Sequence, residues 1–141
     1  MKVRIKRIDK SLPLRVYETG GSVGVDLLAR EDVVVKSNEI KLIPANVIVE
    51  VPKGYALIVV SRSSTPKKHG LTKPHGIGII DQDYCGPEDE VKIQVRSFRN
   101  ESVKIKKGTN LTQGIFMKVD QPEFEEVDEI KKESRGGFGS T

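Results

Sequence analysis

Cysteine is almost absent from this sequence of 141 residues, in which Cys85 is the only one. A single cysteine cannot form a disulfide within the chain, and it cannot supply the paired thiolates of the common zinc sites. We therefore expect a fold that needs no oxidising compartment, and a cytoplasmic location. Histidine is scarce as well, and neither His69 nor His75 has the spacing or the carboxylate neighbours of a metal site.

Long apolar runs and a large excess of one charge are also missing. The N-terminal segment MKVRIKRIDK alternates apolar and basic residues, so it contains no stretch typical of a signal peptide or a membrane span. The 24 Lys and Arg residues against 20 Asp and Glu give a net charge of +4, which is too small and scattered to indicate nucleic-acid binding. We expect no export, no membrane anchoring and no nucleic-acid partner.

The sequence has the length of one ordinary domain and offers no convincing long amphipathic helix. Short alternating or β-branched runs recur instead, and turn formers such as Gly20-Gly21 and Lys107-Gly108 separate them. This pattern predicts an all-β sandwich or barrel. The expected strands cover residues 3–8, 33–35, 47–51, 56–60, 91–95, 103–105 and 115–119.

The C-terminal part of the sequence gives weaker signals. Residues 121–132 are acidic, with Phe124, Val127 and Ile130 spaced by three, so a helical turn and a short strand with a linker both remain open. Residues 134–141 are rich in glycine and contain only Phe138 to bury, which is typical of a mobile tail. We therefore expect one domain over residues 1–133 and a flexible tail over residues 134–141.

Two polar clusters adjoin apolar runs in the first half of the chain. Asp26 begins one such run, and a turn aspartate that accepts backbone hydrogen bonds is the plain alternative for it. Arg62, Ser63 and Ser64 directly follow the apolar residues 55–60, which places a guanidinium group, hydroxyls and loop amides where an anion could be held. A solvated loop is equally open for this second cluster.

The segment from His75 to Gly86 is the most informative one. Glycines that alternate with isoleucines suggest a strand that something approaches closely, and a ligand is the natural candidate. Asp81 follows this apolar run, where partial desolvation could make its carboxylate a usable base, and Tyr84 comes three residues later. A tight hairpin capped by the aspartate is the alternative.

Two further polar segments lie toward the C-terminus. Gln113 ends the polar stretch that begins at Gly108, and it leads into apolar residues 115–117. The Gly-rich tail carries Arg, Ser and Thr, which can wrap a triphosphate with amides, hydroxyls and a fixed cation. A frayed chain end would have a similar composition.

These five segments, in this order and spacing, resemble the five motifs of the trimeric dUTPase family from about residue 23 to residue 141. The strongest matches are Arg62-Ser63-Ser64, residues 78–86 and residues 137–141. The resemblance implies a jelly-roll-like β-sandwich or barrel with a flexible Gly-rich C-terminal tail. It also implies a homotrimer with shared active sites that hydrolyses dUTP to dUMP and pyrophosphate with the help of Mg²⁺.

The resemblance further implies a role for each site residue. Asp81 corresponds to the general base that activates the water attacking the α-phosphorus. Asp26 helps to hold Mg²⁺ through its bound waters, and Arg62 braces this shell. The other residues bind the substrate. The phosphates are contacted by Ser63, Ser64 and Gln113, and the deoxyribose by Tyr84. The uracil slot is lined by Gly78, Ile79 and Ile80, with His75 beside it, and the lid that closes over the nucleotide contains Arg135, Phe138, Gly139, Ser140 and Thr141.

The sequence departs from the family pattern at several places. His75 stands where Asn is common, Asn110 replaces a common Arg, and Cys85 replaces a polar or basic residue. The tail is compressed around Arg135, with Arg-Gly-Gly-Phe in place of the commoner Arg-Gly-x-Gly-Gly-Phe. Residues 87–90 look like a short insertion that only lengthens a loop.

Two other functions are compatible with parts of the sequence. A dCTP deaminase, or a bifunctional deaminase and dUTPase, would share the fold, but it needs a catalytic Glu where this chain has Gln94, and Gln cannot carry protons. A regulatory protein that uses the same scaffold to bind a partner is the alternative from another class.

Overall fold

Strands make up most of the regular structure in the computed structural model, which describes residues 1–134 and 136. The elements in chain order are β1 (Ile5–Arg7), β2 (Val25–Leu28), β3 (Val33–Val35), β4 (Ile40–Pro44), β5 (Val47–Val49), β6 (Tyr55–Ser61), α1 (Ser64–His69), β7 (Leu71–Thr72), β8 (Gly78–Ile80), β9 (Lys92–Ser97), β10 (Val103–Ile105) and β11 (Asn110–Lys118). The all-β prediction is confirmed. Within the described residues, no helix is long and apolar enough to cross a membrane.

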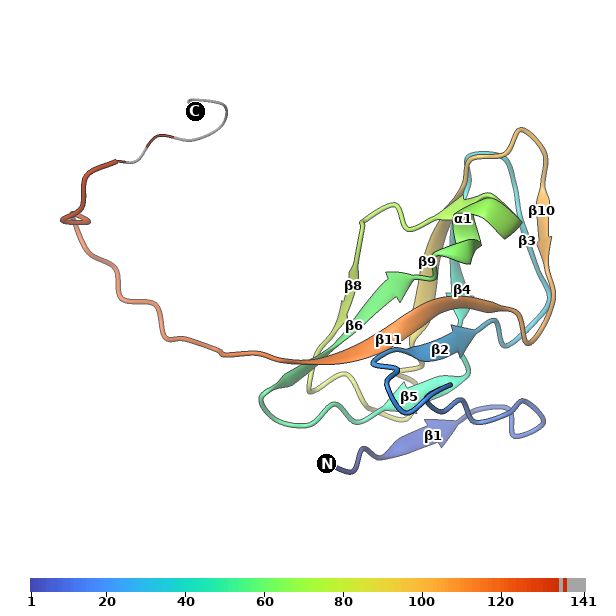
Figure 1. Ribbon diagram of the computed structural model, residues 1–141, viewed down its shortest axis with the longest axis horizontal. Coiled ribbons are helices and arrows are strands. Elements are labelled where there is room, and N and C mark those ends of the chain that lie inside the picture. The colour runs from blue at the N-terminus through green and yellow to red at the C-terminus, as the bar shows by residue number, and fades with distance from the viewer. Residues whose placement is uncertain (135, 137–141) are drawn as a thin grey trace.

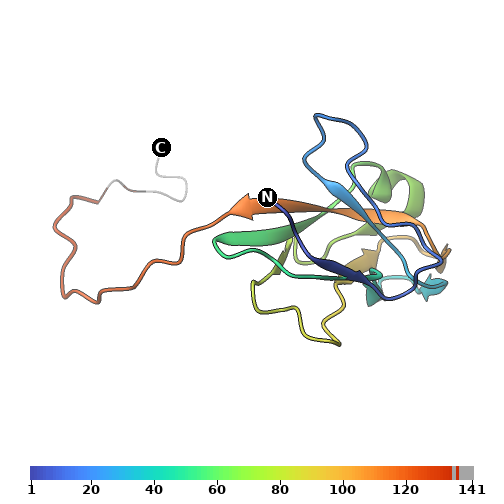
Figure 2. The same ribbon diagram turned by 90° about the horizontal axis from the view of Figure 1, so that it is seen from below.

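The strands form antiparallel sheets packed against one another. The largest has the strand order β2-β11-β6-β8, the next has the order β4-β9-β7, and two strand pairs, β1-β5 and β10-β3, complete the fold. β11 and β6 form the centre of the largest sheet, and β2 and β8 flank them on opposite sides (Figure 1). Seen from below, β1 and β5 cover one face of this sheet (Figure 2). The largest sheet carries Asp26 on β2, Gln113 on β11 and the predicted uracil slot, residues 78–80, on β8.

The core is built from the inward faces of these strands. β3 and β10 each alternate buried, exposed and buried residues, and Val103 pairs directly with Val35 while Ile105 pairs with Val33. Burying one such aliphatic side chain contributes about 1.5–3 kcal/mol. The alternation predicted from the sequence is therefore the feature that sets the register of this pair.

The helix α1 was not predicted, since residues 61–64 were expected to lie in a loop. The helix ends at Gly70, which adopts φ 65° and donates its N–H to the carbonyl oxygen of Pro66. A Cβ atom at Gly70 would lie only 2.4 Å from the side chain of Arg99, so a larger residue here would have to displace that side chain. A left-handed residue and a long-range contact thus stop the helix after six residues.

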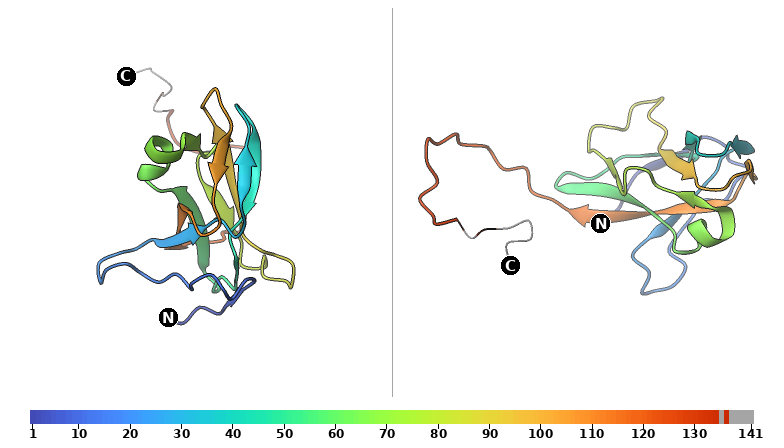
Figure 3. Two further views of the ribbon diagram at one scale, coloured as in Figure 1. Left: turned by 90° about the vertical axis from the view of Figure 1, so that its right-hand side faces the viewer. Right: turned by 90° about the horizontal axis from the view of Figure 1, so that it is seen from above.

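Residues 121–132 form neither the helical turn nor the short strand that the sequence left open. They make no helix and no strand over this described stretch, and they run away from the sheets (Figures 1 and 3). Phe124 is 96% exposed, and Val127 and Ile130 are exposed as well. The described residues of one chain therefore give these apolar side chains nothing to pack against. The lid residues Arg135, Phe138, Gly139, Ser140 and Thr141 lie outside the described residues.

Candidate functional site

Asp26 is the centre of a polar cluster on the largest sheet. Its Oδ1 atom accepts a hydrogen bond from Nε2 of Gln113 at 3.1 Å and pairs with Nε of Arg62 at 3.0 Å. Its Oδ2 atom accepts a hydrogen bond from Nδ2 of Asn110 at 2.8 Å. We call these four residues the Asp26 cluster. The structure thus brings together Asp26, Arg62 and Gln113, and it adds Asn110, to which the sequence assigned no role.

A β-bulge explains why both amides reach the same carboxylate. Asn110 and Gln113 are three residues apart, so in a regular strand they would point to opposite faces of the sheet. The pairing of β11 with β2 shifts register between Asn110 and Thr112, and the residue between them, Leu111, is fully buried. A bulge adds one residue to one strand and turns the side chains beyond it. Both amides consequently face Asp26.

The same bulge anchors the turn that carries the predicted phosphate ligands. The carbonyl oxygen of Leu111 accepts hydrogen bonds from the backbone N–H of Arg62 at 3.4 Å and from Oγ1 of Thr65 at 2.6 Å. Ser63 is exposed and Ser64 half-buried between these two anchors. Within the described chain, the hydroxyl of Ser63 makes no capping bond to α1, so it is free to meet a ligand.

The number of lone pairs that Asp26 has free determines whether it can bind a metal ion directly or through water. A carboxylate offers about four lone-pair sites. Gln113 uses one on Oδ1 and Asn110 uses one on Oδ2, while Arg62 contacts Oδ1 as an ion pair, which leaves about two sites, one of them on Oδ2. Within the part of the chain described, no three His, Cys, Asp or Glu residues gather at one point. This donor set fits a hydrated Mg²⁺ held through water, which Mg²⁺ prefers, rather than a dehydrated ion.

The predicted uracil slot lies on β8, which pairs with β6 along one edge of the sheet. Ile79 is 58% exposed and Gly78 is partly buried. A Cβ atom at Gly78 would meet Nε2 of His75 at 3.5 Å and Nζ of Lys73 at 3.6 Å. The side chains that approach Gly78 closely are therefore the chain's own, and burial lowers the pKa of the Lys73 ammonium group.

Asp81 and Tyr84 lie in the loop that follows β8, which we call the Asp81 loop (residues 81–90). The backbone N–H of Tyr84 donates to the carbonyl oxygen of Asp81 at 3.4 Å, and the Tyr84 hydroxyl donates to the carbonyl oxygen of Glu90 at 3.3 Å. The side chain of Asp81 is exposed. The partial desolvation expected for Asp81 is therefore not provided by the described residues of one chain.

Residues 87–90 do more than lengthen a loop, so that expectation was wrong. Glu90 is only 6% exposed. Its Oε1 atom accepts hydrogen bonds from Nε of Arg30 and from the backbone N–H of Asn46, both at 2.8 Å. A buried carboxylate is tolerated only when it is paired in this way. Glu90 therefore fixes the end of the Asp81 loop to the body of the fold.

The Asp26 cluster and the Asp81 loop lie far apart within one chain. Asp26 is on β2 and Asp81 follows β8, and these two strands form opposite edges of the four-stranded sheet (Figure 1). Three strand spacings amount to roughly 14 Å, and the offset along the strands from the level of Val60 to that of Leu57 adds about 10 Å. One chain therefore does not bring its predicted base and its predicted metal-holding carboxylate to one point.

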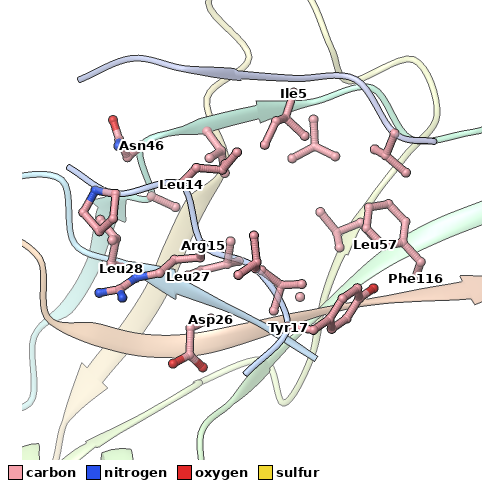
Figure 4. A pocket seen from close by; sticks show the side chains of 18 of the residues that line it. Ile5, Leu14, Arg15, Tyr17, Asp26, Leu27, Leu28, Asn46, Leu57 and Phe116 are labelled. Carbon is pink, nitrogen blue, oxygen red and sulfur yellow. The ribbon is translucent and has the colours of Figure 1, made fainter. Parts of the chain in front are cut away.

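An apolar pocket of about 330 Å³ lies on the inner side of the same sheet, where the sequence indicated no site. Its walls include Leu14, Leu57 and Phe116, and Figure 4 shows the carboxylate of Asp26 pointing away from these side chains. Asp26 thus lines the pocket only with its backbone, and its carboxylate lies on the outer face of the sheet. The pocket and the Asp26 cluster are separate features.

The comparisons with known proteins agree with this fold. The family model for dUTPase matches residues 10–141. The chain is 37% identical over 143 residues to the deoxyuridine 5'-triphosphate nucleotidohydrolase of Nautilia profundicola, covering 100% of this chain and 99% of that one. It is 39% identical to the enzyme of the same name from Finegoldia magna, covering 99% of both chains.

Solved structures give the same result. The crystal structure of dUTPase from Streptococcus mutans is 27% identical, has a TM-score of 0.78, and is matched over 85% of this chain and 98% of that one. The Staphylococcus bacteriophage 80alpha dUTPase with dUPNHPP, at 23% identity, shares the fold with a TM-score of 0.86 over 99% of this chain and 98% of that one. The match of the family model over residues 10–141 and the two relatives at 37% and 39% identity show that the chain belongs to the dUTPase family.

Proposed function

We propose that this chain is a dUTP pyrophosphatase that hydrolyses dUTP to dUMP and pyrophosphate with Mg²⁺ as its cofactor. The match to the dUTPase family over residues 10–141 carries the proposal. Relatives matched over nearly their whole length bear the name deoxyuridine 5'-triphosphate nucleotidohydrolase. The Asp26 cluster and the exposed Asp81 carboxylate supply side chains suited to this reaction.

Asp26 would hold the magnesium ion through water, using the lone pair that remains on Oδ2. When bound, Mg²⁺ neutralises charge on the phosphate oxygens, which is the main requirement of phosphoryl chemistry. Gln113 uses one N–H for Asp26, so its second N–H is available to a phosphate oxygen. Ser63 and Ser64 follow Arg62 and would donate their hydroxyls to the same phosphates.

Asp81 would act as the general base. Its carboxylate accepts a proton from a water molecule while the water oxygen forms a bond to the α-phosphorus. The bond between the α-phosphorus and the bridging oxygen breaks, and pyrophosphate leaves with its electron pair. No covalent intermediate with the protein is required.

Substrate selection would come from β8 and Tyr84. β8 is an edge strand, so one row of its backbone N–H and C=O groups has no strand partner in the described residues. These groups at Gly78, Ile79 and Ile80 suit the donor and acceptor pattern of uracil, and a close backbone leaves no room for the thymine methyl group. Tyr84 would pack against the deoxyribose and exclude a ribose 2′-hydroxyl.

We further propose a homotrimer in which each active site combines segments from different subunits. The distance between the Asp26 cluster and the Asp81 loop supports shared sites, because both are needed at one triphosphate. The outer face of the largest sheet also supports assembly, since residues directly paired across strands share a face. That face presents a row of partly or largely exposed aliphatic side chains beside Gln113: Ile58, Val60, Ile79, Ile115 and Met117.

The tail would complete the site as a lid. Arg135, Ser140 and Thr141 would grip the phosphates, and Phe138 would stack on the uracil, with Gly139 allowing the turn. Closing such a lid expels water and strengthens the electrostatic interactions within the site. The domain would accordingly end near Glu133.

The proposal is tested by incubating the chain with dUTP and Mg²⁺ and resolving the products by anion exchange. We expect dUMP and pyrophosphate in equal amounts, and loss of turnover when Mg²⁺ is chelated. Unreacted dUTP, or formation of dUTP from dCTP in a parallel reaction, would contradict it. Gln94 carries an amide rather than a carboxyl group, so we expect no deamination.

A further inference from the structure

Lys73 has no role in the function proposed above, yet its side chain lies beside the predicted uracil slot. It begins the turn that joins β7 to β8, in which the backbone N–H of Gly76 donates to the carbonyl oxygen of Lys73 at 3.1 Å and Gly76 adopts φ 73°. The turn brings the chain back on itself, and a Cβ atom at Gly78 would lie 3.6 Å from Nζ of Lys73. The ammonium group therefore reaches the first residue of β8 from across the turn.

The two strands that this turn joins belong to different sheets. β7 pairs with β9, whereas β8 pairs with β6. Within the described chain, β8 thus lies at an edge of the largest sheet (Figure 1), and one row of its backbone N–H and C=O groups has no strand partner. A base with donors and acceptors along its rim can pair with this edge. The ammonium group of Lys73 is then available to an acceptor atom of the same base.

A second side chain reaches the same place. Nε2 of His75 would lie 3.5 Å from the Cβ position at Gly78, and the resemblance to dUTPases places His75 beside the uracil slot. Lys73 shares this location, although the sequence assigned it no role. Because residue 78 is glycine, no side chain fills the space that the two nitrogen atoms approach. The surroundings of Gly78 therefore offer hydrogen-bond donors to a ligand at the slot.

The fold alone does not account for the position of this ammonium group. Val59 pairs directly with Gly78, is only 1% exposed, and has its Cβ atom 3.4 Å from the same Cβ position. Burial lowers the pKa of the Lys73 ammonium group. None of the ion pairs of the described chain includes Lys73, and the turn uses only its backbone. A partly desolvated cation without a partner costs stability, so an acceptor on a ligand would suit it.

We propose that Lys73 is a specificity-determining residue whose ammonium group donates a hydrogen bond to the carbonyl oxygen at C4 of uracil. The inference rests on the function proposed above. Cytosine carries an amino group at C4, and an ammonium group offers donors and no acceptor. A site built to hydrogen-bond one group strongly rejects an analogue that leaves its donor unpaired. Lys73 thereby adds to the selection of uracil by the backbone of β8.

One substitution and a matched control test this inference. Lys73→Met removes the ammonium group and keeps an unbranched side chain of similar size. Lys104→Met is the control, because Lys104 is an exposed cation on β10 that also makes no ion pair within the described residues. For these two variants and the unsubstituted chain, calorimetry would measure binding of the α,β-imido analogues of dUTP and dCTP with Mg²⁺. Turnover of dUTP and the melting temperature would be recorded as well.

Lys73→Met should weaken binding of the dUTP analogue about 10-fold to 100-fold, as expected for the loss of a hydrogen bond from a charged donor. Binding of the dCTP analogue should stay the same or become tighter, so the preference for uracil falls by a similar factor. The loss in turnover should appear in KM rather than in kcat, because Lys73 contacts the base and not the reacting atoms. The melting temperature should equal or exceed that of the unsubstituted chain. Lys104→Met should change none of these properties.

An equal loss of affinity for both analogues would overturn the inference, because it would place the ammonium group at a phosphate or at the C2 carbonyl, which both nucleotides share. Unchanged binding of the dUTP analogue to Lys73→Met would overturn it too. A lower melting temperature with an unchanged preference for uracil would assign Lys73 to the fold. Failure of the proposed function gives a different result, since the unsubstituted chain itself would then neither hydrolyse dUTP nor prefer its analogue.

Discussion

Asp26 and Asp81 are both carboxylates beside edge strands of one sheet, yet their surroundings differ. The side chain of Asp26 is 17% exposed and is held by a guanidinium group and two amides. The side chain of Asp81 is exposed, and the described residues give its carboxylate no hydrogen-bond partner. The Asp26 cluster is therefore preorganised within a single chain, whereas the carboxylate of Asp81 needs a second copy of the chain or the substrate to fix its position. This difference leads to distinct expectations for stability and for turnover.

We expect the largest effect on turnover from a substitution of Asp81, the carboxylate that is not preorganised. Asp81→Asn should reduce turnover on the order of 100-fold or more, because it removes the proton acceptor. The melting temperature and the oligomeric state should stay unchanged, since no described residue forms a hydrogen bond with this carboxylate. Steady-state kinetics and light scattering measure the two properties. Near-normal turnover would mean that another group activates the water.

Removal of residues 134–141 should abolish most of the activity while sparing the fold. Ser134 is exposed, and Phe138 is the only large apolar residue of this segment. A chain ending at Glu133 should therefore melt at nearly the same temperature but hydrolyse dUTP slowly, because the water-excluding lid is lost. Calorimetry and a product assay test both points. Full activity of the shortened chain would show that the tail is not catalytic.

Arg62→Met, unlike Asp81→Asn, should lower the stability of the fold. It removes the cation that pairs with the half-buried Asp26 among the described residues, which should lower the free energy of unfolding by about 1–3 kcal/mol. Lys68→Met, which changes an exposed cation of the nearby helix, is the control and should have little effect. Chemical denaturation of the three chains makes the comparison. Equal stability of Arg62→Met and the unsubstituted chain would mean that the Asp26 cluster is not preorganised by this pair.

The smallest effect is expected at His69, at the end of α1. Burial, together with the cations Lys68, Arg99 and Arg62, holds the pKa of His69 below its ordinary value of 6.5. The unfolded chain then binds a proton at higher pH than the folded chain, so stability falls as the pH drops below about 6.5. His69→Gln should lose this part of the pH dependence. Denaturation midpoints between pH 5 and 7.5 test it, and parallel curves for both chains would contradict it.

The sequence predicted those elements whose signals are local. The strands at residues 33–35 and 103–105 have the expected bounds, because alternating β-branched residues fit a half-buried strand. β2, β4 and β7 were missed, and β11 begins at Asn110, five residues earlier than predicted, inside a stretch that reads as polar loop. Tertiary pairing overrides such local composition.

The site was predictable in its residue types and not in its geometry. The motif residues Asp26, Arg62 and Gln113 do meet, but the contact of Asn110 depends on a bulge that pairs β11 with β2 across more than 80 residues of sequence. Glu90 was assigned to a short insertion that only lengthens a loop, and its contacts with Arg30 and Asn46 explain its burial. No pattern within the sequence signals either long-range contact.

Subunit complementation tests the shared site most directly. Asp26→Asn and Asp81→Asn chains, each inactive alone, would be mixed, allowed to exchange subunits, and assayed with dUTP and Mg²⁺. If every site takes the Asp26 cluster from one chain and the Asp81 loop from another, about a quarter of the sites in an equal mixture combine two intact carboxylates. We therefore predict that activity returns to roughly that fraction of the unsubstituted level. An inactive mixture, with subunit exchange confirmed by mass spectrometry, would contradict the account, because it would place both carboxylates of each site in a single chain.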